Sequence, residues 1–409
     1  MNKKKIFNDP LYGFVTISSE LIFDIIQHPF FQRLRRIKQL GVSEYVYPGA
    51  LHTRFQHAIG AMHLMGKAMD GLRGKNIDIT DEEYESGLIA VLLHDIGHGP
   101  FSHALEYSLF QDVQHESLSF LLMKHLNKEF NGVLDTALKI FQNTYQKKFL
   151  HQLVSSQLDV DRMDYLQRDS FFTGVSEGTV GVERILEMLN VVDDNIVVEE
   201  KGIYSIENLL SSRRLMYWQV YLHKTSLGAE RMLINLINRA KELAESGNKV
   251  PASNELSLFL TNSYNLSDFQ NNSNLLQAFG AMDDHDIGGA IKLWANDKDK
   301  VLSELSNMLL NRRLLKINLV NSPSKKTDIE NIREKIAREF KVLRSESRYF
   351  MTHGEVSNKA YVSGGQTINI LTKKGEVVDI AKAADLPNIK AISKIVKKYY
   401  LGYPKNIVL

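Results

Sequence analysis

Apolar residues recur at helical spacing over most of the first 240 residues, with little alternation of period two. Residues 20–41 place apolar side chains on one face and basic side chains between them, which predicts one amphipathic helix ending at Gly41. A second helix is expected from about Thr53 to Arg73. A third is expected to begin at Asp81, because Thr80 is a favourable N-cap and acidic residues fill the first turn.

The C-terminal part of the chain has a different pattern. Polar, proline-containing segments at 246–255 and 321–328 are the clearest breaks. Beyond them we predict a helix at 328–343 and then a hairpin around a Lys-Lys-Gly-Glu turn flanked by β-branched residues. One further small hairpin is expected in the core, in NIVVEEKGIYSI at 195–206. The sequence thus predicts a mainly α protein with three parts: a helical core at 1–250, a helical extension at 251–325 and a small α+β appendage at 326–409.

Composition narrows the classes of function. The chain has 409 residues and no cysteine, which excludes a disulfide scaffold, a zinc–thiolate site, an iron–sulfur cluster and a cysteine nucleophile. A formal net charge of +2 argues against wholesale wrapping of nucleic acid or adhesion to an acidic membrane. The N-terminus lacks the apolar stretch of a signal peptide, and apolar runs fall short of the roughly 18–20 residues of a membrane span. We therefore expect a cytoplasmic protein with no membrane partner.

Histidines and carboxylates gather after the third predicted helix. His94 and Asp95 follow a strongly apolar run, where a buried imidazole and carboxylate need a polar partner or a metal. The same dipeptide at 285–286 follows acidic residues and is interpreted as solvated surface. A single such histidine is more often an ordinary core or surface residue, but several occur here in apolar settings. The other members of this group are His57, His98, His103, Glu106 and Asp161.

This set of ligand types favours a metal site. Imidazole and carboxylate groups without thiolates suit divalent Mg, Mn, Fe, Ni or Zn, and open coordination positions would activate water. The identity of the metal stays open.

The order His57, His94-Asp95, Asp161 resembles the H…HD…D metal set of the HD-domain phosphohydrolases. Further segments over roughly residues 6–240 are similar to the deoxynucleoside triphosphate triphosphohydrolase branch of that family, which includes the sterile-alpha-motif and HD-domain proteins of animals. The resemblance implies a helical HD-domain core that hydrolyses dNTPs to deoxynucleoside and inorganic triphosphate. It also implies a homo-oligomer, often a tetramer, regulated by a dNTP activator. The segments are FNDPLYGFVTIS, FFQRLRRIKQLG, YPGALHTRFQHAIG, HDIGHGPFSH, LDVDRMDYLQRDS and YLHK.

The resemblance assigns catalytic roles by position. His57, His94, Asp95 and Asp161 would hold a cation that lowers the pKa of a bound water towards neutrality. His103 matches the general acid that protonates the leaving 5′-oxygen, and Glu106 follows it by one helical turn. His98 and His115 match histidines that crowd the α-phosphate.

Substrate contacts also follow from the resemblance. Arg54, Arg162 and Arg213 match triphosphate contacts, with Lys224 a weaker candidate, because several cations are needed around this anion. Arg162 stands where relatives often have lysine, and Tyr217 stands where the animal protein has histidine. Tyr165 follows the metal-binding aspartate by one turn. At the sugar, Gln39 and Asp169 match residues that hold the 3′-hydroxyl, and Leu40 and Tyr221 match those that leave no room at C2′.

A regulatory nucleotide pocket is expected near the N-terminus by the same resemblance. The matching residues are Lys5, Ile6, Asn8, Gln32 and Arg35. Gln27 stands where the animal protein has the acidic residue that reads guanine, which favours a different activator or none.

Two alternatives remain from the residues alone. One is an HD phosphohydrolase acting on another phosphate ester, such as a nucleoside monophosphate, a cyclic nucleotide or a guanosine alarmone. The other is a non-enzymatic module that binds nucleic acid or a nucleotide through its basic helix and keeps the metal for structure. The four sugar-contact positions favour dNTP hydrolysis over the first. Near-neutral charge and an intact His103 argue against the second.

Overall fold

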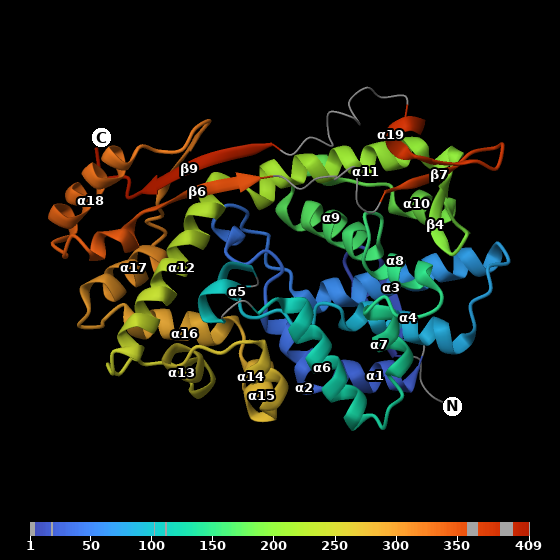
Figure 1. Ribbon diagram of the computed structural model, residues 1–409, viewed down its shortest axis with the longest axis horizontal. Coiled ribbons are helices and arrows are strands. Elements are labelled where there is room, and N and C mark those ends of the chain that lie inside the picture. Colours follow the sequence, from blue (N-terminus) through green and yellow to red (C-terminus); the bar gives the residue numbers. More distant parts are fainter. Residues whose placement is uncertain are drawn as a thin grey trace.

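Helices dominate the protein, as the sequence predicts. The structure, a computed structural model, describes residues 5–17, 19–101, 103–110, 113–357, 367–384 and 396–408. Most of this chain is helical, and the strands form small sheets (Figure 1). Within the described ranges, every helix is too short or too polar to cross a membrane.

The N-terminal segment corrects one expectation. The chain begins with an antiparallel hairpin of β1 (Lys5–Asp9) and β2 (Gly13–Ile17), followed by α1 (Glu20–Gln27) and α2 (Pro29–Gln32). The single helix predicted for 20–41 is therefore wrong. His28 is extended (ψ 138°), because a residue that precedes proline is disfavoured in the α region. After α2 the chain tightens into a 3₁₀ turn at Arg33–Arg36 and then becomes extended.

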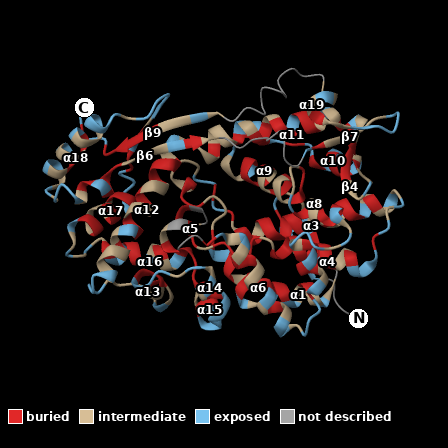
Figure 2. Ribbon diagram, viewed as in Figure 1, coloured by how far each residue is buried: buried red, intermediate tan, exposed pale blue. Residues whose placement is uncertain are grey.

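Three helices of the core carry the residues that matter most for the site. They are α3 (Arg54–Gly74), α4 (Asp81–Leu93) and α9 (Val160–Thr173), and α3 packs against both of the others. The predicted starts of α3 and α4 are confirmed. Thr80 accepts a hydrogen bond from the Glu83 backbone N–H at 3.2 Å, and the Glu83 side chain accepts one from Thr80 N at 2.8 Å. Buried residues line α3 and the helices around it (Figure 2).

The remaining core helices surround these three. Between α4 and α9 the chain forms α5 (His103–Leu109), α6 (His115–Glu129), α7 (Asp135–Phe141) and α8 (Lys148–Val154). After α9 come α10 (Val182–Met188), α11 (Ile203–Met216), a π-helical turn at Tyr217–Tyr221 and α12 (Lys224–Glu245).

The extension packs on α12. It contains α13 (Asn254–Thr261), α14 (Leu266–Asn271), α15 (Ser273–Ala281), α16 (Asp284–Trp294) and α17 (Lys300–Leu310). Helices α16 and α17 contact each other, and α17 contacts α12 (Figure 1). The C-terminal helices are α18 (Lys326–Phe340), close to the predicted 328–343, and α19 (Ile380–Ala383).

Two small sheets join the C-terminal part to earlier segments of the chain, one to the core and one to the extension. One has the order β3 (Leu189–Val192), β4 (Asn195–Glu199), β7 (Asn369–Leu371), β8 (Val377–Asp379), in which β4 and β7 are parallel. The other has β9 (Lys397–Tyr403) between β5 (Lys316–Val320) and β6 (Thr352–Ser357). Each sheet therefore pairs strands that are far apart in the sequence.

The two predicted hairpins have different outcomes. The C-terminal hairpin is confirmed by β7 and β8, whose turn contains Gly375 at φ +83°, although residues 358–366 lie outside the described ranges. The hairpin predicted at 195–206 is displaced. Its residues 195–199 form β4, which pairs with the preceding β3 through a turn with Asp193 and Asp194 at positive φ. The residues that follow β4 form a 3₁₀ turn at Glu200–Gly202, and α11 begins at Ile203.

Candidate metal centre and active site

Four side chains from α3, α4 and α9 meet at one point in the core. His57 lies in the first turn of α3, His94 and Asp95 directly follow α4, and Asp161 is in the first turn of α9. The Oδ1 atom of Asp161 is 3.0 Å from His57 Nε2 and 3.4 Å from His94 Nε2. Asp95 adjoins them, with Oδ1 3.3 Å from His94 Nε2 and Oδ2 3.7 Å from His57 Nε2. The structure thus brings together all four residues predicted as metal ligands.

Hydrogen bonds on the far side of each imidazole ring fix its orientation. His57 Nδ1 donates to Asp164 Oδ2 at 2.7 Å, and His94 Nδ1 donates to the Val91 carbonyl at 2.5 Å. Each Nε2 atom is then the ring position that offers a lone pair. Both Nε2 atoms are buried and lack a hydrogen-bond partner among the described residues. The Nε2 lone pairs of the two histidines lie beside the carboxylate oxygens of Asp95 and Asp161. This arrangement of nitrogen and oxygen ligands suits a divalent cation.

The carboxylates around His57 and His94 favour positive charge on both imidazole rings. Burial opposes a charge on His57, but Asp161 and Asp164 raise its pKa to about 10. Burial likewise opposes a charge on His94, and Asp95 and Asp161 raise its pKa to about 9. A site that stabilises positive charge this strongly suits a metal ion, so the cluster has the electrostatics as well as the composition of a divalent metal site.

Asp95 also connects the cluster to a second group of side chains. Arg54 Nη1 donates a short hydrogen bond to Asp95 Oδ2, and His98 Nε2 lies 3.3 Å from Asp95 Oδ1. Burial opposes ionisation of Asp95, but the two neighbouring histidines and Arg54 hold its pKa well below the usual range. Burial and Arg54 lower the pKa of His98 well below its ordinary value, so that His98 is neutral near pH 7.

The histidines proposed to crowd the α-phosphate lie together. The rings of His98 and His115 stack with centroids 3.9 Å apart. His115 donates to Glu106 Oε1 through its backbone N–H at 2.8 Å and through Nδ1 at 3.0 Å. The side chain of His103 lies outside the described part of the structure, so its expected contact with Glu106 stays a prediction.

The turn after α4 is held by Ser119 from α6. The Gly97 N–H donates to Ser119 Oγ at 2.9 Å, and Ser119 Oγ donates to the His94 carbonyl at 2.7 Å. Helix α4 ends at Leu93, so Gly97 lies beyond the helix and does not terminate it. Gly97 instead permits close packing, since a Cβ there would lie 2.2 Å from Ser119 N.

We expect Gly97→Ala to destabilise the protein by about 1–3 kcal/mol, because the added methyl group overlaps the backbone of α6. Gly99→Ala is the matched control, since its Cβ would meet only the rings of Phe279 and Phe110, at ordinary distances of 3.5 and 3.8 Å. Urea unfolding of both variants measures the difference. Equal free energies of unfolding would contradict this account of the turn.

A separate cluster of side chains surrounds Asp169, which is buried. Its Oδ1 accepts from His52 Nε2 at 2.7 Å, and its Oδ2 accepts from the Tyr221 hydroxyl at 2.7 Å. The Gln39 N–H donates to the His52 carbonyl at 2.9 Å, and Gln39 Oε1 is buried with no hydrogen-bond partner in the described chain. Leu40 is partly buried against the core. The sequence analysis missed His52, although it lies in the YPGALHTRFQH segment five residues before His57.

Tyrosines connect the Asp169 cluster to the metal centre. The Tyr165 ring is 6.5 Å from the His57 ring and 6.2 Å from the Tyr221 ring, and Tyr221 is 5.4 Å from Tyr217. Tyr217 and Tyr221 bound the π-helical turn, an element often found at functional sites. Burial raises the pKa of Tyr165 well above its usual value, and the charges of two nearby arginines oppose this shift.

Those arginines are Arg162 and Arg213. Arg162 Nη1 donates to Asp159 Oδ2 at 2.5 Å, and Asp159 also caps α9. Arg213 Nη1 donates to Gln157 Oε1 at 3.0 Å. Lys224 lies exposed at the start of α12. The arginines thus lie within electrostatic reach of Tyr165, beside the metal centre.

The residues expected to form a regulatory pocket lie on and beside the N-terminal hairpin. The Lys5 ammonium group lies 3.1 Å from the centre of the Phe23 ring, and Arg35 Nε donates to Gln32 Oε1 at 2.9 Å. Asn8 and Arg35 line a pocket of about 330 Å³. Ile6 and Gln27 are exposed.

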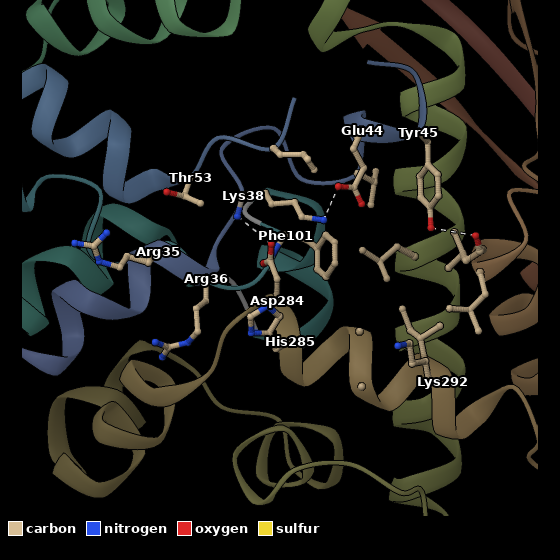
Figure 3. A pocket seen from close by; sticks show the side chains of 18 residues that line it. Arg35, Arg36, Lys38, Glu44, Tyr45, Thr53, Phe101, Asp284, His285 and Lys292 are labelled. Atoms are coloured by element: carbon tan, nitrogen blue, oxygen red, sulfur yellow. Dashed lines mark hydrogen bonds and ion pairs between the residues drawn. The ribbon is translucent and has the colours of Figure 1, made fainter. Parts of the chain in front are cut away.

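The extension also reaches the site. Asp284 of α16 accepts from the Lys38 N–H at 2.9 Å and from the Phe101 N–H at 2.7 Å (Figure 3). These contacts tie the residue before Gln39 to the loop between His98 and α5, along one wall of a pocket of about 610 Å³. The neighbouring His285 is exposed, as predicted.

Comparison with known proteins identifies the family. An HD domain matches residues 54–169, and an HD-associated region matches residues 180–255. The protein YwfO of Bacillus subtilis is 31% identical over 421 residues, which span 100% of this chain and 94% of YwfO. A crystal structure of a phosphohydrolase from Bacteroides thetaiotaomicron is 50% identical, with a TM-score of 0.95 over 98% of this chain and 100% of that chain. The chain belongs to the HD-domain phosphohydrolases.

A more distant similarity concerns the substrate class. The deoxynucleoside triphosphate triphosphohydrolase SAMHD1 homolog of Dictyostelium discoideum is 32% identical over 257 residues, which cover 58% of this chain and 50% of that protein. All four residues of the metal cluster fall within the segment that matches the HD domain. The geometry of this HD-domain phosphohydrolase therefore agrees with the divalent metal site that such a domain carries.

Proposed function

We propose that this HD-domain phosphohydrolase hydrolyses dNTPs to deoxynucleoside and inorganic triphosphate. The observation that carries the proposal is the hydrogen-bonded cluster of His52, Asp169 and Tyr221, because Asp169 lies on α9, the helix that also carries Asp161 of the metal centre. Asp169 and Gln39 would offer polar groups to a sugar hydroxyl, and the Tyr165 ring lies near both the Tyr221 ring and the His57 ring. The similarity to the Dictyostelium triphosphohydrolase supports the same substrate class.

At the metal centre, His57, His94, Asp95 and Asp161 would hold a divalent ion, which supplies Lewis acidity and a bound water of lowered pKa. Arg54 orients Asp95 from the opposite side. In the proposed reaction, water adds to the α-phosphorus while the bond to the 5′-oxygen breaks. His103 donates a proton to that oxygen, so the products are the deoxynucleoside and triphosphate.

The triphosphate would lie among the arginines. Arg162 and Arg213 lie near Tyr165, and Arg54 lies against Asp95 at the metal cluster. Lys224 would add a flexible charge from α12. Asp159 holds Arg162 in place through a charged hydrogen bond. Fixed guanidinium groups suit phosphate oxygens, because they donate in a planar, bidentate geometry.

Selection of deoxyribose would depend on shape at C2′. The Tyr221 hydroxyl is fixed by Asp169 at 2.7 Å, so its ring has little freedom to move away from an additional hydroxyl group. Leu40 would close the other side. A ribose 2′-hydroxyl would then meet apolar surface without a hydrogen-bond partner.

We further propose that a dNTP activator binds beside the N-terminal hairpin and that the chain forms a homo-oligomer. The pocket there is lined by Asn8, Asp9 and Arg35, and Arg35 offers it a guanidinium group for an anionic ligand. Sedimentation velocity with and without dNTPs tests both parts.

Product analysis tests the reaction. Purified protein is incubated with four dNTPs together and with four rNTPs in parallel, each with Mn²⁺ or Mg²⁺. We expect free deoxynucleosides and intact triphosphate from the dNTPs only. Monophosphate with pyrophosphate, or equal hydrolysis of rNTPs, would contradict the proposal while leaving the metal site intact. No turnover, with dNTPs present as substrate and activator together, would favour a nucleotide-binding module.

A further inference from the structure

A chain of buried side chains joins the N-terminal hairpin to the metal centre. Arg168 Nη1 donates to Asp9 Oδ2 at 2.8 Å. The same guanidinium group holds Asp164 with two further hydrogen bonds, each of 2.9 Å. Asp164 in turn accepts from His57 Nδ1 at 2.7 Å. All four side chains are buried, and they come from β1, α9 and α3.

We propose that Asp9 is a positioning residue for the metal ligand His57 and acts through Arg168 and Asp164. The inference rests on the metal centre of the proposed function and is independent of its substrate. It gives the N-terminal hairpin a role in holding the metal.

The charges explain why Asp9 matters. A carboxylate that accepts the Nδ1–H of a histidine makes the opposite ring nitrogen a better ligand. Arg168 withdraws part of the negative charge of Asp164, because it binds both of its oxygens. Asp9 faces Arg168 from the other side and offsets this withdrawal. Asp9 therefore contributes to the donor strength of His57 as well as to its orientation.

Close packing of α3 against Asp164 and Arg168 restricts the positions of these two side chains. Gly60 lies one turn after His57 on α3, and a Cβ there would be 2.1 Å from Asp164 Oδ1 and 2.2 Å from Arg168 Nη2. The ion pair thus lies directly against the α3 backbone. Helices α3 and α9 pack side by side along this contact.

The other oxygen of Asp9 fixes the hairpin itself. Asp9 Oδ1 accepts from the backbone N–H groups of Leu11 and Tyr12 at 2.9 and 3.2 Å. One carboxylate thus sets the turn between β1 and β2 and contacts the arginine that supports the metal centre. A change in this turn would be transmitted to Arg168 without passing through the substrate site.

The test is the affinity of metal-free protein for Mn²⁺, measured by isothermal titration calorimetry without nucleotide. Asp9→Asn keeps the size of the side chain and an acceptor for the turn but removes the charge. We expect Mn²⁺ to bind about 10–100-fold more weakly, as for loss of a partner behind a metal ligand. Asp24→Asn, an exposed change on α1, is the matched control and should bind Mn²⁺ like the wild type.

A purely structural role predicts a different result. Asp9→Asn would then lower the unfolding temperature of the metal-free protein but leave the Mn²⁺ affinity unchanged, and this outcome would overturn the inference. If Asp9→Asn does not fold, the Mn²⁺ affinity of Arg168→Lys is measured instead. Lysine keeps the positive charge but loses the paired hydrogen bonds to Asp164. Unchanged Mn²⁺ affinity in Arg168→Lys would also overturn it.

The experiments distinguish an error in the proposed reaction from an error in the role of Asp9. A wild type that binds Mn²⁺ but releases no triphosphate from dNTPs would refute the proposed reaction, and the weaker binding in Asp9→Asn would still support the inference. A wild type that binds no Mn²⁺ would overturn the inference itself.

Discussion

Asp161→Asn is expected to lower kcat by about 10³-fold or more while leaving the helical fold intact. The Asp161 carboxylate faces both His57 Nε2 and His94 Nε2, at 3.0 and 3.4 Å. An amide of the same size keeps the packing but removes one negative charge from the cluster. In the proposed reaction Asp161 would help to hold the ion that lowers the pKa of a bound water, so its replacement would weaken that activation.

Turnover at saturating Mn²⁺ and the metal content of the purified protein together measure this effect. Asp24→Asn is the control, because it makes the same chemical change at an exposed position. Circular dichroism should show the same helix content in all three proteins. Wild-type turnover in Asp161→Asn would contradict the assignment of Asp161 as a metal ligand.

His103→Ala is expected to lower kcat by about 10²–10⁴-fold and to leave dNTP binding nearly unchanged. A general acid acts mainly in the transition state, when the 5′-oxygen leaves as a poor leaving group. A dNTP analogue with sulfur at the 5′ bridging position needs little protonation, because a thiolate leaves readily. The variant should therefore lose much less activity on this analogue.

Single-turnover rates and equilibrium binding, measured on both substrates, separate these effects. His285→Ala is the control, since His285 is exposed and lies outside the proposed site. An equal loss of rate on the two substrates, or a loss of binding that matches the loss of rate, would argue against His103 as the acid.

Local sequence was enough to predict α3, α4 and the mainly helical fold. Thr80 and Glu83 form a capping box at the position where the sequence signals it, and the apolar run after it packs in the core. The prediction failed at 20–41, where helical periodicity was followed through Pro29. The spacing of apolar residues indicates which face of a helix is buried. It does not show where the helix ends, and a proline disfavours helical backbone at the residue before it.

The strands were harder to predict because their partners are distant. Strand β4 pairs in parallel with β7, a strand more than 170 residues later in the chain. Strand β3 follows α10 directly, and its four residues are too few for a period to be recognised. A pattern of local residues contains no information on such pairings.

The same limit applies to the site. The cluster of His57, His94, Asp95 and Asp161 was predicted from residue types and from family resemblance. Its supporting side chains were missed, because each contact joins residues far apart in the chain. The separation is 117 residues for His52 and Asp169, 159 for Asp9 and Arg168, and 246 for Lys38 and Asp284. Only the folded chain shows them as partners.

Hydrolysis of a dNTP in water enriched with ¹⁸O, followed by mass spectrometry of both products, tests the central claim most directly. Attack of water at the α-phosphorus predicts one ¹⁸O atom in inorganic triphosphate and none in the deoxynucleoside. Label in the 5′-hydroxyl group of the deoxynucleoside, or products that are monophosphate and pyrophosphate, would contradict the account.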